Sequence, residues 1–164
     1  MDKRSITLIE IAGILFGITV FAGIFLPSVC GRRHPATLRC ANNLRQLHTL
    51  GTVYAASHRG EWPDAQGEEL WLSFTKTIPP LVEADHLSIL CCPIRDEEFT
   101  LGDIHYRGPR GRWNRSKPPR VLGADKIGNH GEDFGGNVLL GDGSVEEVEL
   151  RSELWDRAAS TLSP

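Results

Sequence analysis

Residues 37–58 read TLRCANNLRQLHTLGTVYAASH, and this stretch decides the fold. Its apolar side chains recur at steps of three, four and six residues, a spacing that places them on one face of an α-helix. The set comprises Leu38, Leu44, Leu47, Leu50, Val53 and Tyr54. We therefore predict an amphipathic helix whose Leu44, Leu47 and Tyr54 pack against a sheet. A helical tether with no further role fits the same pattern.

A strongly apolar segment precedes this helix. Residues 6–26, ITLIEIAGILFGITVFAGIFL, contain two threonines and one carboxylate, Glu10, among apolar residues. At about 1.5 Å per residue, a helix of this length spans about 31 Å, the thickness of a bilayer core. We predict that it crosses the membrane. Pro27 and Pro35 each remove a helix hydrogen bond, so we expect kinks or a local break between 27 and 36.

Three kinds of N-terminal segment compete for this region. A cleaved secretory signal has a shorter apolar run, followed by a small-residue cleavage site that is not found here. A lipoprotein signal would end before Cys30, but Pro27 and Val29 stand where lipid attachment requires leucine and a small residue. A retained membrane anchor is therefore favoured.

The carboxylate of Glu10 is costly inside such a segment. An ionised side chain at the centre of a membrane helix costs about 2.5–3.5 kcal/mol on insertion scales. A buried carboxylate becomes tolerable when it is paired with a cation, and intramembrane ionisable residues usually mark function. The alternative is that Glu10 lies close enough to the membrane surface to stay hydrated.

The chain after residue 59 favours turns and short strands. The sequence has 17 glycines and 10 prolines, and they concentrate in this part. We predict a short helix over 68–78 and a short buried strand over 87–93, which Pro93 ends. We predict that the part after residue 59 is a small single domain.

The C-terminal region carries the strongest turn signal. Asp142-Gly143 lies between two strand-like runs within 137–150, and Asp-Gly supplies the positive φ angles of a tight hairpin turn. Ser152 precedes a helical pattern and predicts its N-cap. The expected fold is α+β, with the long N-terminal helix packed on a small antiparallel sheet.

Three motifs resemble those of a known protein family. Residues 3–10, KRSITLIE, resemble the prepilin peptidase motif, and residues 40–47, CANNLRQL, resemble the CxNNLRQL signature of bacterial pseudopilin-like proteins. His130 and Asp142-Gly143 resemble the C-terminal His…Asp-Gly motif of that group, with eleven residues rather than nine between His and Asp. The chain is thus similar to type II secretion pseudopilins and type IV pilin-like proteins.

The resemblance implies processing and assembly. Residues 1–5 would be a leader, cut between Ser5 and Ile6, where the family usually has glycine and phenylalanine. Glu10 would then be the fifth mature residue and would pair with the free, usually methylated, α-amino group of a neighbouring subunit. The implied partners are other pilin-like subunits of the same or different kind, a prepilin peptidase, an inner-membrane assembly platform and membrane lipid.

The resemblance also implies a domain plan and a location. A helix over 6–58, spanning the membrane over 6–26, would carry a periplasmic α+β head, 59–164. The protein would cross the bacterial inner membrane once, with its N-terminus in the cytoplasm. Lysine and arginine lie on both sides of the span, so charge alone leaves the orientation undecided. The competing hypothesis is a membrane-anchored periplasmic binding module that does not polymerise, and Ser5 in place of glycine favours it.

The four cysteines allow three pairings. Cys40 and Cys92 match positions of the family, which implies a Cys40–Cys92 disulfide, with Cys91 as the neighbouring alternative and Cys30 free. Such a bond closes a long loop and is worth about 4 kcal/mol in the chain-entropy model. The spacing C-x-x-C is lacking, which argues against a metal-thiolate site. Asn42 and Asn43 belong to the family motif without an assigned role.

Other chemistry has weaker support. Net charge is −3, so nothing global points to nucleic acid. The basic run 107–120 is expected to be a solvated loop, or a surface that meets the acidic stretch 146–149 of a neighbouring subunit. Catalytic motifs are lacking, so an enzyme is not expected. We expect no cofactor, with calcium as a weak alternative whose oxygen ligands would come from Asp125, Asp133 and Asp142.

Overall fold

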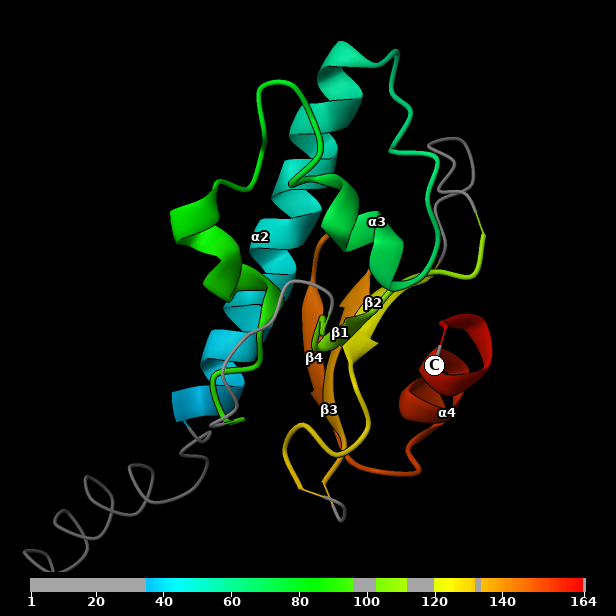
Figure 1. Cartoon of the computed structure of the whole chain (residues 1–164). Helices are drawn as coiled ribbons and strands as arrows, with labels where there is room; N and C mark the ends of the chain where they lie inside the picture. The colour runs from blue at the N-terminus through cyan, green and yellow to red at the C-terminus, as the bar shows by residue number, and fades with distance from the viewer. Residues whose placement is uncertain (1–34, 96–102, 112–119, 132–133, 164) are drawn as a thin grey trace, which may run out of the picture. The chain divides into compact units, whose positions relative to one another are not determined.

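The structure is a computed structural model that describes residues 35–95, 103–111, 120–131 and 134–163. These residues belong to one compact unit (Figure 1). The predicted leader and membrane span, 1–26, lie outside the described residues. Within the described ranges, no helix has the length and apolar character needed to cross a membrane.

A long helix and a four-stranded antiparallel sheet form the body of the unit. The helix is α2 (Pro35–Ser57), and the strands in sheet order are β1 (Tyr106–Arg107), β2 (Val121–Asp125), β3 (Gly136–Leu140) and β4 (Val145–Val148). The α+β class predicted from the sequence is therefore confirmed, with the long helix packed against the sheet in a pilin-like arrangement.

The sheet separates two apolar layers. Strand side chains alternate between the two faces, so Leu122 and Leu139 join the core under α2, while Val121 and Val138 face the other way. The helix α4 (Glu153–Thr161) covers this second face, on the opposite side of the sheet from α2 (Figure 1). The unit is thus a helix–sheet–helix sandwich.

The buried face of α2 differs in part from the predicted stripe. Leu44 and Leu47 are fully buried and Tyr54 is half-buried, whereas Leu38 and Val53 are 41% and 50% exposed. The buried face instead includes small residues, Cys40, Ala41, Gly51 and Ala55. The prediction that Leu38 and Val53 share the buried face is therefore wrong. Helical spacing alone does not say which of two neighbouring stripes of a helix meets the sheet.

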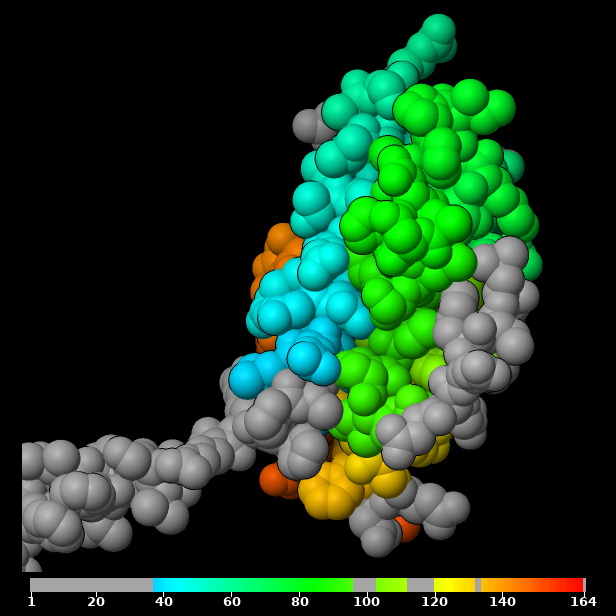
Figure 2. Space-filling view, turned by 60° about the vertical axis from the view of Figure 1, so that its left-hand side comes forward, coloured from blue at the N-terminus to red at the C-terminus, as the bar shows by residue number. Residues whose placement is uncertain are grey.

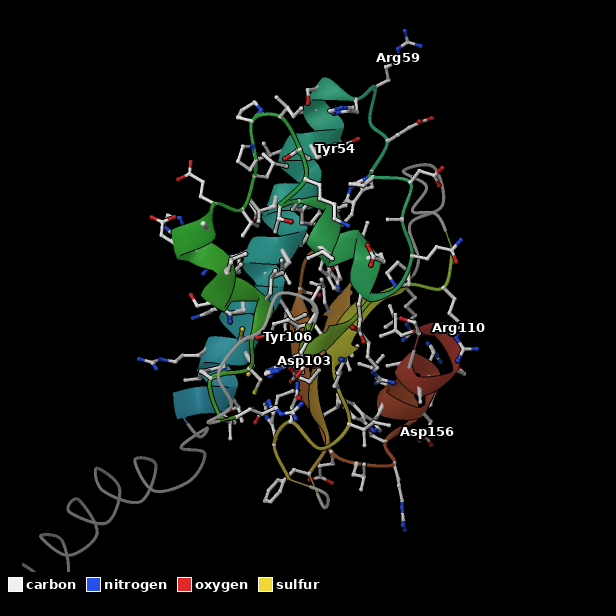
Figure 3. All side chains as sticks on the ribbon, in the orientation of Figure 1. Tyr54, Arg59, Asp103, Tyr106, Arg110 and Asp156 are labelled. Carbon is white, nitrogen blue, oxygen red and sulfur yellow. The ribbon has the colours of Figure 1, made fainter. Side chains whose placement is uncertain are left out.

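The helix α2 begins at Pro35 and ends with a backbone reversal. Proline is favoured at the first helical position, where its missing N–H has no helical partner. At the other end Arg59 and Gly60 have φ of 57° and 85°, and Gly60 N–H donates to Ala55 O at 2.8 Å. The Arg59 side chain points away from the body (Figure 3). The chain then runs back beside α2, where the ring centre of Trp62 lies 5.7 Å from the ring centre of His48.

The predicted strand over 87–93 is wrong. Ala84–Leu90 forms a short 3₁₀-helix, η1, in which His86 N–H donates to Glu83 O at 3.0 Å. Leu87 and Leu90 lie three residues apart and turn inward, while Ser88 is exposed, which is the period of a 3₁₀-helix rather than of a strand. A short apolar run does not distinguish these two conformations.

The predicted helix over 68–78 is shorter than expected. The helix α3 covers Glu68–Ser73, and beyond it the N–H groups of Phe74, Thr75 and Lys76 bond carbonyls three residues back. The helix therefore tightens into turns well before Pro79. Trp71 and Phe74 remain fully buried under α2.

The predicted β3–β4 hairpin is confirmed. Gly143 has φ of 88°, and Leu140 N–H donates to Ser144 O at 2.8 Å. Asp142 Oδ1 accepts from Ser144 N–H at 2.9 Å, the side-chain bond that favours aspartate in such turns. A Cβ on Gly143 would contact the His48 ring, so the turn packs against α2.

Ser152 caps the last helix as predicted. Its hydroxyl accepts from Trp155 N–H at 3.3 Å, and Trp155 and Ala158 are buried against the sheet.

We expect Ser152→Ala to lower the free energy of unfolding by about 1 kcal/mol, because an unsatisfied N–H is left at the helix start. Urea unfolding followed by circular dichroism measures this change. Ser152→Asp retains a capping oxygen and should lose much less; equal losses in the two variants would contradict the role.

Candidate functional site

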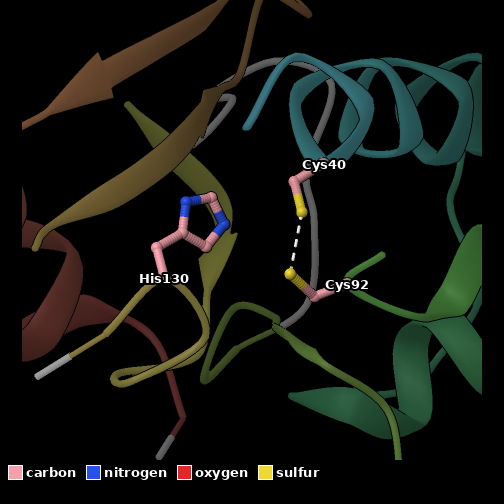
Figure 4. Close-up of side chains that lie close together, drawn as sticks. All are labelled: Cys40, Cys92 and His130. Carbon is pink, nitrogen blue, oxygen red and sulfur yellow. Dashed lines mark hydrogen bonds between the residues drawn. The ribbon is translucent and has the colours of Figure 1, made fainter. Parts of the chain in front are cut away.

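Three side chains from distant parts of the sequence meet beside the sheet. Cys40 lies on the buried face of α2, Cys92 follows η1, and His130 lies in the loop between β2 and β3. Their sulfur and ring-nitrogen atoms all lie within 4.8 Å of one another (Figure 4). We call these three residues the thiol–histidine cluster. It unites residues from three stretches that lie far apart in the sequence.

The two sulfurs of the cluster face each other. Cys40 and Cys92 are 0% and 1% exposed, and their Sγ atoms lie 3.0 Å apart as thiols, with Cys40 donating. A disulfide requires a shorter, covalent S–S distance of about 2.05 Å. The Cys40–Cys92 disulfide therefore stays a prediction, made from two residues that the fold does bring together.

Cys91 points elsewhere. Its sulfur is half-buried and lies 3.8 Å from Leu87 O, outside the cluster. Burial raises the pKa of the Cys91 thiol to about 11. Of the two adjacent cysteines, Cys92 is thus the one that faces Cys40. Cys30 lies outside the described residues.

Backbone contacts hold Cys92 in place. Cys92 N–H donates to His105 Nδ1 at 2.9 Å, and His105 N–H donates to Leu90 O at 3.0 Å. On the other side, Asn43 Nδ2 and the hydroxyl of Tyr106 both donate to Cys91 O, at 3.0 and 2.9 Å. Figure 3 shows Tyr106 in the middle of the unit.

The family-motif asparagines therefore have different positions. Asn43 faces inward and joins α2 to the segment that carries Cys92. Asn42 is exposed, and its side-chain oxygen accepts from Arg45 on the same helix at 2.9 Å. The first of these contacts assists the site, whereas the second is local to α2.

Asp125, at the end of β2, anchors the histidine side of the cluster. Its Oδ2 lies 3.1 Å from His130 Nε2 and accepts from the backbone N–H and the side-chain amide of Asn137, at 2.7 and 2.9 Å. The Asn137 amide also donates to Thr37 O at 3.1 Å, which links this group to α2. Asp125 is fully buried.

The three members of the cluster differ in protonation. The hydrogen bond from Cys40 lowers the pKa of the Cys92 thiol to about 5, and the same contact holds the pKa of Cys40 well above its usual value. Burial opposes the charge of His130, but hydrogen bonding to Asp125 and Cys92 outweighs it and raises the pKa of His130 to about 10. These shifts favour a Cys92 thiolate beside a His130 imidazolium.

This arrangement suits bond formation inside the protein. A thiolate is the form that attacks a disulfide or binds a metal. Both sulfurs are buried, so a dissolved substrate does not reach them in this conformation. Cys40 and Cys92 are placed to join each other, or to hold a small ion between them.

The remaining predicted residues do not gather at one site. Asp125 and Asp142 lie at opposite ends of β3, since Asp125 neighbours Asn137 whereas Asp142 lies in the β3–β4 turn. The two therefore do not share a calcium ion, and Asp133 lies outside the described residues. For the same reason His130 and Asp142-Gly143 are apart: His130 adjoins Cys40, and Gly143 adjoins His48, further along α2.

The arginines of the basic run 107–120 are likewise found in different environments, some buried and some exposed. Arg107 is 3% exposed, lies in β1, and stacks its guanidinium 5.2 Å from the centre of the Trp155 ring. It is therefore part of the core, not of a solvated loop. Arg110 and Arg120 are exposed, and Arg110 points outward in Figure 3. Residues 112–119 lie outside the described residues, as do Ser5, Ile6 and Glu10.

Comparison with protein-family models, curated proteins and solved structures finds no match to this chain.

Sequence reasoning missed His105, Tyr106 and Asn137 as parts of the site. Each acts through a contact with a segment far along the chain, such as the Asn137–Thr37 bond across 100 residues. No periodicity or motif signals such a contact. Burial of polar residues is the one clue, and it is known only after folding.

Proposed function

We propose that the chain is a structural, pseudopilin-like subunit. Its N-terminal helix inserts in the bacterial inner membrane, and subunits assemble into a helical pseudopilus or pilus fibre of a secretion or pilus system. The observation that carries the proposal is the packing of α2 along an antiparallel sheet, directly after the apolar segment with a prepilin-like motif. In this proposal the predicted span anchors the unit that begins with α2.

The outer side of α2 supports this proposal. Between β4 and the α3–η1 segment, the helix surface remains open along its length (Figure 2). The residues on this side are exposed and include apolar and polar ones, namely Leu38, Arg45, Gln46, Thr49 and Val53. A fibre with helices inside and heads outside needs such an uncovered helix face. Its repeated head-to-tail contacts join two different surfaces of each subunit.

Glu10 supplies the docking charge in this proposal. Leader removal after Ser5 creates an α-amino group on Ile6, which a neighbouring Glu10 neutralises within the membrane. The two groups come from different subunits, so the cost of burying each charge falls as the fibre forms. The partners are other pilin-like subunits, a prepilin peptidase and an assembly platform.

The N-terminal mass of the mature protein tests processing. We expect the membrane-bound protein to begin at Ile6, with a methylated amine, and to be shorter than the full chain by residues 1–5. Mass spectrometry of the purified membrane protein measures this directly. The alternative, a membrane-anchored binding module that does not polymerise, predicts an intact Met1, and finding it would count against the fibre subunit.

Glu10→Ala tests assembly separately from folding. We expect the variant to insert in the membrane and fold, but to reduce fibre formation at least about 10-fold, because the amine of the next subunit loses its partner. Pelleting of sheared fibres, with the membrane fraction quantified in parallel, measures the ratio. Thr19→Ala, which removes a neutral polar group from the same segment, is the matched control. Normal fibres from Glu10→Ala would end the pairing hypothesis.

A further inference from the structure

The thiol–histidine cluster has the ligand set of a metal site. Two sulfurs and an imidazole converge from α2, the end of η1 and the β2–β3 loop, with all three ligand atoms within 4.8 Å of one another. In Figure 4 the ring of His130 is turned toward the facing sulfurs of Cys40 and Cys92. We propose that the reduced cluster binds one Zn²⁺ ion through Cys40, Cys92 and His130.

The ligand chemistry matches zinc. Zn²⁺ binds thiolate sulfur at about 2.3 Å and imidazole nitrogen at about 2.0–2.1 Å, in tetrahedral geometry. Tetrahedral angles then place two sulfurs about 3.8 Å apart. The present Sγ–Sγ distance of 3.0 Å must therefore open slightly, which is a displacement of less than one bond length shared by two side chains. Binding releases the protons of the Cys40 thiol and of the ligating nitrogen of His130, and the two thiolates then cancel the charge of the ion in a buried site.

A buried polar atom without a partner supports the same assignment. The His130 side chain is 5% exposed, and its Nε2 lies 3.1 Å from Asp125 Oδ2. The other oxygen of this carboxylate, Oδ1, is buried and has no hydrogen-bond partner among the residues that the structure describes. Buried polar atoms are nearly always satisfied, so an unpartnered one beside a set of ligands supports a site for an ion or a water molecule.

Asp125 supports the donor set from outside it. Its carboxylate lies beside His130 and is held by Asn137, so it does not need to be ordered when the ion binds. The group of ligand atoms within 4.8 Å of one another does not include Asp125, so in this proposal the carboxylate orients His130 and a water molecule that takes the fourth position. The absence of a C-x-x-C motif argued against such a site from the sequence, but the ligands here are brought together by folding rather than by short spacing.

A disulfide would use the same two sulfurs. Zinc requires both cysteines as thiolates, whereas a Cys40–Cys92 disulfide leaves neither available. The two states exclude each other, so the thiol content of the folded protein decides between them. This inference does not depend on fibre assembly, because its three ligands lie outside the predicted leader and membrane span.

Cobalt and zinc titrations of the full-length chain test the site. The protein carries Cys30→Ser in all samples and is purified in detergent under anaerobic, reducing conditions. We expect one equivalent of Co²⁺ to give the visible bands of a tetrahedral thiolate complex, and one equivalent of Zn²⁺ to abolish them. Elemental analysis after gel filtration gives the stoichiometry independently.

Single substitutions identify the ligands. We expect Cys40→Ser, Cys92→Ser and His130→Ala each to weaken Zn²⁺ binding at least about 100-fold, since even the loss of a residue that only orients a ligand costs about 10–100-fold. Cys91→Ser is the matched control, because Cys91 is adjacent in sequence but its sulfur lies outside the cluster. The affinity of the Cys91→Ser variant for Zn²⁺ should be unchanged. Near-UV circular dichroism verifies folding, and His130→Gln replaces His130→Ala if the latter is unfolded.

Three results would overturn the proposal. The first is a reduced, folded chain that binds neither Co²⁺ nor Zn²⁺ at one equivalent. The second is a Cys91→Ser variant that loses as much affinity as Cys92→Ser, which places the ion elsewhere. The third is a Cys40–Cys92 disulfide, found by peptide mapping, that persists in the folded protein under the reducing conditions of the titration.

Discussion

Replacing Gly51 by alanine will lower the free energy of unfolding by about 1–3 kcal/mol, the usual cost of overpacking a core. The loss occurs although alanine is the better helix former by about 1 kcal/mol. Gly51 lies in the middle of α2, and the ring of Trp62 packs directly on it. A Cβ at this position would overlap ring carbons of Trp62, so the indole would have to move. Its contact with Phe74, at 6.3 Å between ring centres, would be disturbed.

A double-mutant cycle with Trp62→Leu isolates this clash. When the ring is removed, Gly51→Ala should become neutral or stabilising by up to about 1 kcal/mol, because the helix propensity of alanine is then unopposed. Urea unfolding of the full-length chain, followed by far-UV circular dichroism, measures all four proteins. If Gly51→Ala stabilises the original chain as much as the Trp62→Leu variant, the close packing of Gly51 and Trp62 is wrong.

Asp125→Ala should cost about 3–5 kcal/mol, the range for removing one partner of a buried ion pair. The carboxylate accepts two hydrogen bonds from Asn137 and lies 3.1 Å from His130 Nε2, all inside the protein. Without it, the Asn137 N–H and the His130 ring lose their buried partner. The contact between Asn137 and Thr37 O weakens with them, so α2 loses one attachment to the sheet.

Two variants control for this result. Asp125→Asn retains an oxygen for Asn137 N–H and removes only the charge, so its loss should be smaller than that of alanine. Glu146→Gln changes an exposed carboxylate on β4 and should stay within about 0.5 kcal/mol of the original protein. Urea unfolding measures each variant. An Asp125→Ala protein as stable as Glu146→Gln would show that the buried carboxylate has no structural role.

Local features of the fold followed from local sequence. The β3–β4 hairpin came from Asp142-Gly143, and the start of α4 came from Ser152, because each depends on bonds within three or four residues. The strand predicted over 87–93 failed because a short apolar run has no intrinsic preference between a strand and a 3₁₀-helix. Among the described residues, no strand lies beside 87–93 to pair with it.

The sequence by itself determined the long helix, the hairpin, the capped last helix and the α+β class, since periodicity and turn chemistry act over a few residues. The tertiary structure alone decided which face of α2 is buried, why Gly51 is glycine, and that Cys40, Cys92 and His130 meet. Cys40 and Cys92 are 52 residues apart, and they touch only when α2 and η1 pack on the same side of the sheet. Contacts of this kind depend on the packing of all layers at once, and they leave no pattern in any one segment of the chain.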